Sequence, residues 1–133
     1  MQQALSRLRV IKVSNLEELF VLLSMILTQL KRKQLQVDLK LIVIDSLSSL
    51  FATQSTNKQT YYQMVKDLLF YFKTLAKNHF VGIVYTNNTK DATVTRVTDL
   101  KNQVGEPLTW AVDKQIFANQ MADGLTSYVF LKH

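Results

Sequence analysis

The 133-residue sequence contains no cysteine, one proline and three glycines. Without cysteine, the chain cannot form a disulfide scaffold, a thiolate metal site, a thiol nucleophile or a dithiol redox motif. Because so few residues break or bend regular structure, long helices and strands should dominate over loops. The length fits one domain, and 47% hydrophobic with 20% charged residues is the composition of a globular chain rather than a disordered or fibrous one.

Long hydrophobic runs and targeting signals are also missing. The longest apolar stretch, residues 19–27, is interrupted by Ser24 and falls short of the roughly 20 residues that span a membrane. Residues 1–11 do not place a basic segment before an apolar one, as a signal peptide would. We therefore expect a soluble intracellular protein with no membrane partner. Its formal net charge of +6 is compatible with a polyanionic partner.

Short runs rich in β-branched and aromatic residues predict the strands. The run Leu41–Ile44 is continuously apolar, as is typical of strands buried on both faces of a parallel sheet, and the third predicted strand looks equally buried. Residues 121–124, Met-Ala-Asp-Gly, favour a hairpin turn between the last two strands. The strands are expected at Leu8–Val13, Leu39–Asp45, Phe80–Thr86, Gln115–Asn119 and Ser127–Leu131.

Helical periodicity predicts two helices between these strands. The first starts at Ser14, with Glu17 at capping-box spacing, and ends at the basic residues 31–33. The second runs from Lys58 to Asn78, after a Ser- and Thr-rich connection over residues 46–57. Residues 87–105 are expected to form a long loop, and residues 107–110 a short helical turn. This order predicts an α/β fold with a mostly parallel sheet and a C-terminal antiparallel hairpin at its edge.

An acid stands where the most apolar strand ends. Asp45 and Ser46 follow residues 41–44 directly, and ligands of open α/β sheets bind beyond the carboxyl ends of strands. In phosphate-binding enzymes an Asp at this place holds magnesium, directly or through water. The alternative is that Asp45 only caps the turn after a buried strand.

Two amides follow the next predicted strand. If the two strands are neighbours, Asn87 and Asn88 lie near Asp45 at the same sheet edge. An amide there can hydrogen-bond a phosphate oxygen or a bound water. Ordinary turn chemistry is again the alternative, because Asn tolerates left-handed backbone and initiates turns.

Several segments occur in the order and spacing of a known family. Residues 39–47, Leu-Lys-Leu-Ile-Val-Ile-Asp-Ser-Leu, are similar to the Walker B strand of RecA-type strand-exchange recombinases. Residues 73–76, Lys-Thr-Leu-Ala, resemble the helix that follows, and residues 84–87, Val-Tyr-Thr-Asn, the next strand. Residues 8–13 and their helix resemble the elements before Walker B. The chain most resembles the eukaryotic recombinase paralogues, the D-type paralogue above all, over about residues 5–131.

The resemblance implies a partial, three-layer RecA-like core over residues 1–133, of the P-loop NTPase type and truncated at its N-terminal side. It implies ATP and magnesium as cofactors, with Asp45 as the magnesium ligand and Asn88 at the catalytic sensor position. Asp45, Ser46, Asn87 and Asn88 would together face the nucleotide. No G-x-x-x-x-G-K-[ST] pattern occurs in the sequence, so whether this chain is itself an enzyme stays open.

In this family, DNA is bound by loops that here correspond to residues 52–59 and 88–105. Residues 90–106 hold three basic and three acidic residues, and no aromatic residue that could stack a base. By contrast, residues 46–89 hold four basic residues and one acidic residue. The residues predicted to bind DNA are Lys58, Lys90, Arg96 and Lys101, with solvated surface charges as the alternative.

The resemblance therefore implies a nuclear recombinase-paralogue subunit that supports homologous recombination and DNA double-strand break repair. Its partners would be other paralogues or the recombinase, together with single-stranded DNA, and exposed apolar residues such as Val21 and Met25 would form the protein interface. Two alternatives remain. The chain could be a fragment of a DNA-dependent ATPase whose P-loop lies upstream, or a generic α/β ligand-binding domain.

Overall fold

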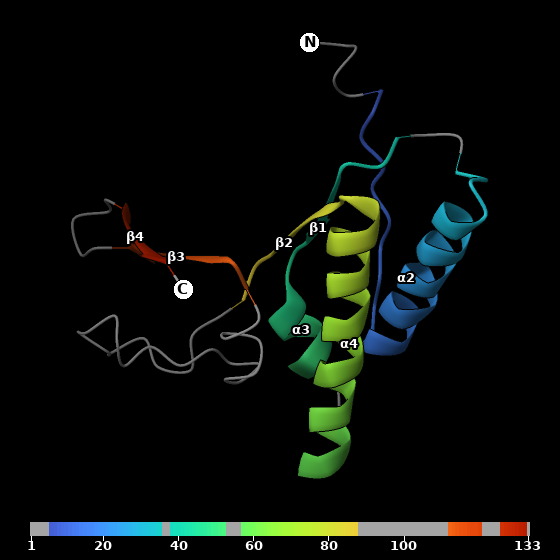
Figure 1. Cartoon of the computed structure of the whole chain (residues 1–133). Coiled ribbons are helices and arrows are strands. Elements are labelled where there is room, and N and C mark those ends of the chain that lie inside the picture. Colours follow the sequence, from blue (N-terminus) through green and yellow to red (C-terminus); the bar gives the residue numbers. More distant parts are fainter. Residues whose placement is uncertain (1–5, 36–37, 53–56, 88–111, 121–125, 133) are drawn as a thin grey trace.

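The structure, a computed structural model, describes residues 6–35, 38–52, 57–87, 112–120 and 126–132. A β-α-β unit is followed by a separate pair of strands (Figure 1). The predicted α/β class is therefore confirmed. In chain order the elements are α2 (Leu16–Lys31), β1 (Leu41–Ile44), α3 (Leu47–Ala52), α4 (Lys58–His79), β2 (Gly82–Tyr85), β3 (Lys114–Gln120) and β4 (Thr126–Lys132).

Strands β1 and β2 are parallel neighbours, as the sequence predicts. Their register pairs Leu41 with Gly82 and Ile44 with Tyr85. The predicted hairpin is also confirmed, because β3 and β4 pair antiparallel over their full length. Its predicted place at the edge of the parallel sheet is wrong for the described residues, since β3 and β4 form a two-stranded sheet of their own. In Figure 1 the hairpin lies to the left of the β1–β2 pair, on the side away from α2.

Helix α2 begins one residue later than predicted. Asn15, not Ser14, is the N-cap, and its side-chain oxygen accepts a hydrogen bond from the backbone N–H of Glu18 at 2.9 Å. The Glu18 carboxylate in turn accepts from the backbone N–H of Ser14 at 2.7 Å. This pattern resembles a capping box at Asn15–Glu18, one position after the predicted Ser14–Glu17, except that Glu18 bonds to the N–H of the residue before the N-cap.

Helix α4 has almost the predicted bounds. The Asn57 side chain accepts from the backbone N–H of Thr60 at 2.9 Å and caps the N-terminus. At the other end Phe80 adopts left-handed backbone with φ 55°, and the chain turns directly into β2. The predicted connection over residues 46–57 differs, because part of it forms the short helix α3.

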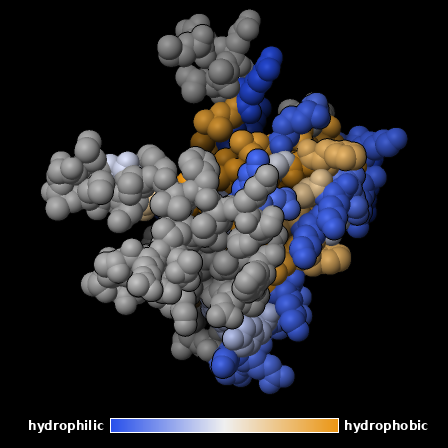
Figure 2. Space-filling model, turned by 60° about the vertical axis from the view of Figure 1, so that its left-hand side comes forward, coloured by the Kyte–Doolittle hydropathy of each residue, from blue (hydrophilic) through white to orange (hydrophobic). Residues whose placement is uncertain are grey.

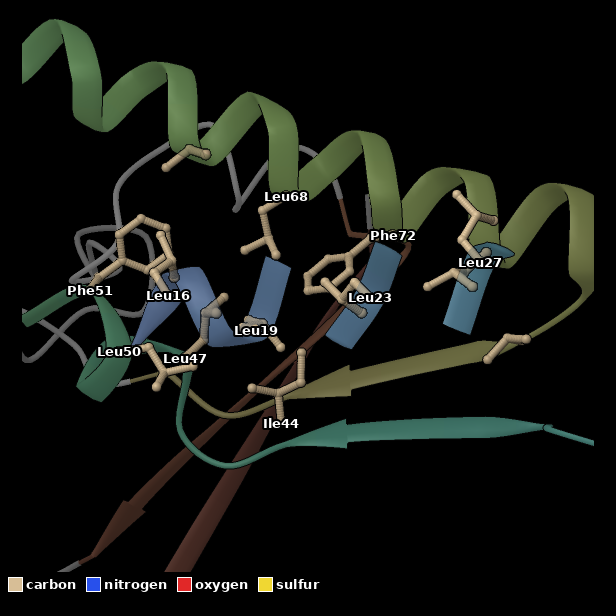
Figure 3. Packing of buried hydrophobic residues seen from close by; sticks show 13 residues of the cluster. Leu16, Leu19, Leu23, Leu27, Ile44, Leu47, Leu50, Phe51, Leu68 and Phe72 are labelled. Carbon is tan, nitrogen blue, oxygen red and sulfur yellow. The ribbon is translucent and has the colours of Figure 1, made fainter. Parts of the chain in front are cut away.

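The hydrophobic core lies between the helices and one face of the β1–β2 pair. Figure 3 shows leucines of α2 between α4 and the strands, with α3 closing one end. Helices α2 and α4 therefore form one layer on one side of the sheet, and the strands form the other. The buried residues are Leu16, Leu19, Leu23, Leu27, Ile44, Leu47, Leu50, Phe51, Val65, Leu68, Phe72, Leu75 and Val81.

The prediction that both strands are buried on both faces is wrong. Ile42, Ile44, Ile83 and Tyr85 pack toward the core, whereas their neighbours on the opposite face are exposed. Figure 2 turns the left-hand side of Figure 1 forward and shows hydrophobic surface, in orange, in its upper part. In the described part of the chain no second helical layer covers this outer face, whose large residues are Leu41, Val43 and Val84.

The predicted strand at Leu8–Val13 is also not found. This segment has no strand pairing, and Leu8, Val10 and Ile11 are exposed. Strand propensity by itself does not form a strand, because the backbone groups need a neighbouring ladder to pair with. Residues 107–110 and the hairpin turn at 121–124 lie outside the described residues.

Candidate functional site

The carboxyl ends of β1 and β2 meet at one edge of the sheet. The backbone N–H of Thr86 donates to the Ile44 carbonyl at 3.0 Å, which extends the ladder by one step and brings Asp45 beside Thr86. The Thr86 hydroxyl then donates to Asp45 Oδ1 at 2.5 Å. The sequence prediction that residues following the two strands meet at a common edge is supported by this bond between positions 41 residues apart.

The Ser46 side chain forms hydrogen bonds with residues of α3, next to this edge of the sheet. Its Oγ accepts from the backbone N–H of Ser49 at 3.3 Å and from the Ser48 hydroxyl at 3.4 Å, and it is also hydrogen-bonded to Ser49 Oγ. The peptide bond between Asp45 and Ser46 is cis. These bonds cap the first turn of α3, so the Ser46 hydroxyl is occupied inside the chain rather than directed only at a ligand.

Helix α3 is tied to the second strand. The backbone N–H of Leu47 donates to the Thr86 carbonyl at 3.0 Å, and the Leu47 side chain is fully buried in the core. Thr86 therefore bonds to the last residue of β1 through its N–H, and to the chain after β1 through its carbonyl and its hydroxyl. This threefold attachment fixes the position of Asp45 relative to residue 87.

Asn87 contributes unsatisfied hydrogen-bonding groups. Both its Nδ2 and its Oδ1 are buried, and neither has a hydrogen-bond partner within the part of the chain that the structure describes. A buried amide without partners costs about 1–3 kcal/mol, so such groups in folded proteins usually meet a ligand, water or ion. The Asn87 amide can donate to a phosphate oxygen through Nδ2 and accept from a metal-bound water through Oδ1.

Asp45 offers the charge that a cation needs. It is exposed, and Oδ2 has no hydrogen bond to another described residue, whereas Oδ1 accepts from Thr86. Carboxylate and amide oxygens are typical magnesium ligands, and magnesium often keeps several waters beside one or two carboxylates. Among the described residues there is no group of three or more acidic or imidazole ligands. Among the described residues at this edge, Asp45 is therefore the carboxylate that could contact a cation.

Tyr85, the last residue of β2, lies at this edge of the sheet and packs toward the core. Its ring stacks on Phe72 of α4, with 5.8 Å between the ring centroids. Burial raises the pKa of Tyr85 to about 12, so the phenol is neutral at physiological pH and adds no charge to the site. Asp45 is therefore the charged group that the two strand ends contribute at this edge.

Thr86 is the residue that sequence reasoning missed. It follows β2 by one position and stands opposite Asp45 once the parallel register is known. A sequence signal existed, because parallel strands of equal length that end at residues 44 and 85 align residue 45 with residue 86.

The remaining predicted site residues lie apart from this sheet edge or outside the described residues. Asn88, Lys90, Arg96 and Lys101 lie outside the described residues. Lys58 is the first residue of α4, and its Nζ lies 5.9 Å from the centroid of the Tyr62 ring. In Figure 1 the start of α4 lies at the far end of that helix from β2.

No protein-family model matches the chain, and no curated protein matches it significantly. None of the described helices is both long and apolar enough to cross a membrane.

Proposed function

We propose that this chain is a partial RecA-type core of a recombinase paralogue. It would support homologous recombination and double-strand break repair by binding partner paralogues or the recombinase, and single-stranded DNA, in the nucleus. The observation that carries the proposal is the hydrogen bond between Thr86 and Asp45. It joins the strand that resembles Walker B to the strand that follows it in the same family.

The open face of the sheet agrees with a three-layer fold. Leu41, Val43 and Val84 are between 51% and 60% exposed on the side of β1 and β2 that faces away from the helices. Apolar side chains in such a row are suited to burial under a further layer. In the proposed fold that layer would belong to the RecA-like core.

The residues at the edge fit magnesium better than they fit a nucleotide. Asp45 would hold the ion, with Thr86 orienting its carboxylate and Asn87 and Asn88 facing a phosphate oxygen. When bound, magnesium neutralises phosphate charge. The sequence has no Walker A pattern to enclose the phosphates, so we propose a binding subunit rather than a catalytic one.

An exposed apolar patch on α2 supports the proposed protein partner. Val21 and Met25 are 60% and 54% exposed, and Leu22 between them is half-buried. A hollow lined in part by Met25 also includes polar residues of α2 and of the segment that follows it, among them Thr28 and Arg32. Apolar residues rimmed by polar ones are common at protein interfaces.

Affinity purification of the tagged chain from native extract, followed by mass spectrometry, tests this proposal. We expect recombinase subunits, and we expect the double substitution Val21→Ser and Met25→Ser to reduce their recovery. The matched control is Val10→Ser with Ile11→Ser, at two other exposed apolar positions. Recovery of no recombinase subunit by the unsubstituted chain would instead favour a generic α/β ligand-binding domain.

The exposed Asp45 carboxylate also favours a second candidate, a piece of a DNA-dependent ATPase. In that case the full chain should bind magnesium–ATP, measured by calorimetry, and Asp45→Asn should abolish the binding. Asp38→Asn is the control, because Asp38 is exposed and its carboxylate pairs with Lys40 at 3.0 Å. Absence of ATP binding would exclude nucleotide binding by this chain on its own, without affecting partner recovery.

A further inference from the structure

Helix α4 presents four lysines and two aromatic rings along its exposed side, with each ring between two lysines. Successive members are separated by four, four, four, three and four residues, which keeps them on one side of a helix. All of them are exposed. We call this set the lysine–aromatic stripe, and it consists of Lys58, Tyr62, Lys66, Phe70, Lys73 and Lys77.

The opposite side of α4 fixes the stripe in place. Val65, Leu68, Phe72 and Leu75 are buried against α2 and the sheet, with exposed fractions of 6% or less (Figure 3). The helix has 22 residues, so at 1.5 Å per residue it is roughly 33 Å long. The stripe is therefore displayed on a rigid element whose orientation is set by the core.

Among the described residues, no carboxylate forms an ion pair with the four lysines of the stripe. Within the described segments, none of them lies within 4.0 Å of a carboxylate. The one acid of α4, Asp67, follows Lys66 by one residue and so points about 100° away from it around the helix. Its Oδ1 accepts a hydrogen bond from Gln63 Nε2 at 2.8 Å. The stripe thus carries four positive charges that are not neutralised within the helix.

The two aromatic rings of the stripe are exposed between these charges. Phe70 is 64% exposed and Tyr62 is 43% exposed, although large apolar surface is usually buried. Phe70 lies four residues after Lys66 and three before Lys73, and Tyr62 lies four residues from both Lys58 and Lys66. The Nζ of Lys58 is 5.9 Å from the Tyr62 ring centroid, within range of a cation–π contact.

We propose that the lysine–aromatic stripe binds single-stranded nucleic acid. Cations that contact phosphates, interleaved with exposed rings on which bases stack, are the two elements of single-strand binding without sequence preference. Neighbouring members of the stripe are roughly 5–6 Å apart along the helix axis. A duplex would engage the lysines but not the rings, because its bases are already stacked inside the helix, and an acidic protein would not require two aromatic rings between the charges.

This surface differs from the loops that the recombinase family uses. It lies on the solvent side of α4 and shares only Lys58 with the residues that the resemblance assigned to DNA binding. The proposal therefore does not depend on the recombinase assignment. It also explains where the positive excess of residues 46–89 lies, because all four basic residues of that segment belong to the stripe.

Fluorescence anisotropy of a labelled oligothymidylate with the full chain tests the lysines. The variant is Lys66→Glu, Lys73→Glu and Lys77→Glu, which leaves Lys58 intact. Its matched control is Lys31→Glu, Arg32→Glu and Lys33→Glu at the exposed end of α2. Each triple variant changes the formal net charge from +6 to 0, that is +6 minus 3 × 2, so a general charge effect is equal in both.

We expect the α4 variant to weaken binding by about ten-fold or more relative to the α2 variant. The slope of log affinity against log salt should also fall by about 0.7 for each lost phosphate contact. Circular dichroism should show unchanged helicity, because all substituted residues are exposed. Equal affinities of the two variants, or no binding by the unsubstituted chain, would overturn the proposal.

A second variant tests the rings without changing charge. Tyr62→Leu with Phe70→Leu keeps apolar bulk but removes the stacking surfaces, and should weaken binding about ten-fold with an unchanged salt slope. Phe80→Leu, at an exposed aromatic residue beyond the end of α4, is the control and should bind normally. If the ring variant binds normally and polyglutamate competes as well as oligothymidylate, the stripe is a surface for acidic proteins and the nucleic-acid proposal is wrong.

These outcomes are separate from those for the proposed function. Loss of binding in the α4 variant with no recombinase subunit recovered would support the stripe and contradict the recombinase assignment. Loss of binding only on charge reversal of Lys90 and Arg96 would contradict the stripe and leave the family loops as the DNA site.

Discussion

The two faces of the β1–β2 sheet are built from similar residues but have opposite surroundings. On the inner face, Ile44 is 8% exposed and lies under the leucines of α2 and α4. On the outer face, Val43 next to it is 60% exposed. The side chains alternate between the faces with period two, so one residue step separates core from surface.

The apolar content of a strand therefore shows that its side chains can be buried, but it does not show whether another layer covers them. The inner face is buried because two helices return along it, and their apolar sides match it in size. The outer face has the same chemistry but, among the described residues, no matching layer. Its exposed valines and leucine are therefore the part of the molecule most suited to a further layer.

The largest loss of stability should come from shortening a buried α4 side chain that packs toward the inner face of the sheet. Leu68→Ala in α4 creates a cavity at a fully buried position and should lower the free energy of unfolding by about 2–5 kcal/mol. Phe70→Ala, two residues on and 64% exposed, is the control and should cost less than about 1 kcal/mol. Urea denaturation followed by circular dichroism measures both. Similar losses would contradict the assignment of the two sides of α4.

A smaller but still large effect is expected on the strand side. Ile44→Thr removes buried apolar surface and places a hydroxyl in the core, which should cost about 2–4 kcal/mol. The same denaturation experiment checks it. A loss below about 0.5 kcal/mol would mean that the helices do not cover this face in solution.

Alkaline pH should lower the free energy of unfolding, because the Tyr85 phenol is buried on the inner face of the sheet. Burial raises the pKa of Tyr85 to about 12, whereas an unfolded tyrosine titrates near 10. Between these values the folded state keeps a proton that the unfolded state has lost. The free energy of unfolding should therefore be unaffected by this group below about pH 10, and fall above it by at most about 1.4 kcal/mol per pH unit.

Tyr85→Phe checks the assignment of this pH effect. The substitution removes the titrating phenol, so the decrease above about pH 10 should become shallower. Urea denaturation at a series of pH values, with the unsubstituted chain in parallel, measures the difference in slope. An identical slope would show that Tyr85 is not buried against Phe72.

The smallest effect is expected on the outer face. Val43→Thr keeps the β-branched shape and, at an exposed position, should change the free energy of unfolding by less than about 0.5 kcal/mol. Because this is the matched partner of Ile44→Thr, the pair measures the difference between the two faces directly. A large loss for Val43→Thr would show that a further layer covers the outer face in solution.

Much of the local structure was predictable from the sequence. The bounds of α4 follow from its apolar periodicity and from Asn57 before it, and the parallel neighbours β1 and β2 follow from the β-α-β order. The N-cap of α2 was wrong by one residue, because two overlapping capping boxes are equally good by sequence. Leu8–Val13 was wrongly predicted as a strand, because a strand depends on a partner that local composition cannot supply.

The candidate site was predictable only in part. Asp45 could be placed at the end of an apolar strand from the sequence, and the position of Asn87 at the same edge followed from the order of elements. The hydrogen bond from Thr86 could not be found without the register. The buried Asn87 amide, which has no hydrogen-bond partner among the described residues, could not be found without the packing around it. The exposed rings of Tyr62 and Phe70 also look like core residues by composition alone.

The sequence by itself determined the bounds of α4 and the residue types that follow each strand, because periodicity and capping act over a few residues. Only the tertiary structure decided which sheet face is covered, that Thr86 bonds to Asp45, and that one side of α4 displays rings among lysines. Those features depend on how segments that are distant in the sequence pack against one another, and local sequence patterns do not specify that packing.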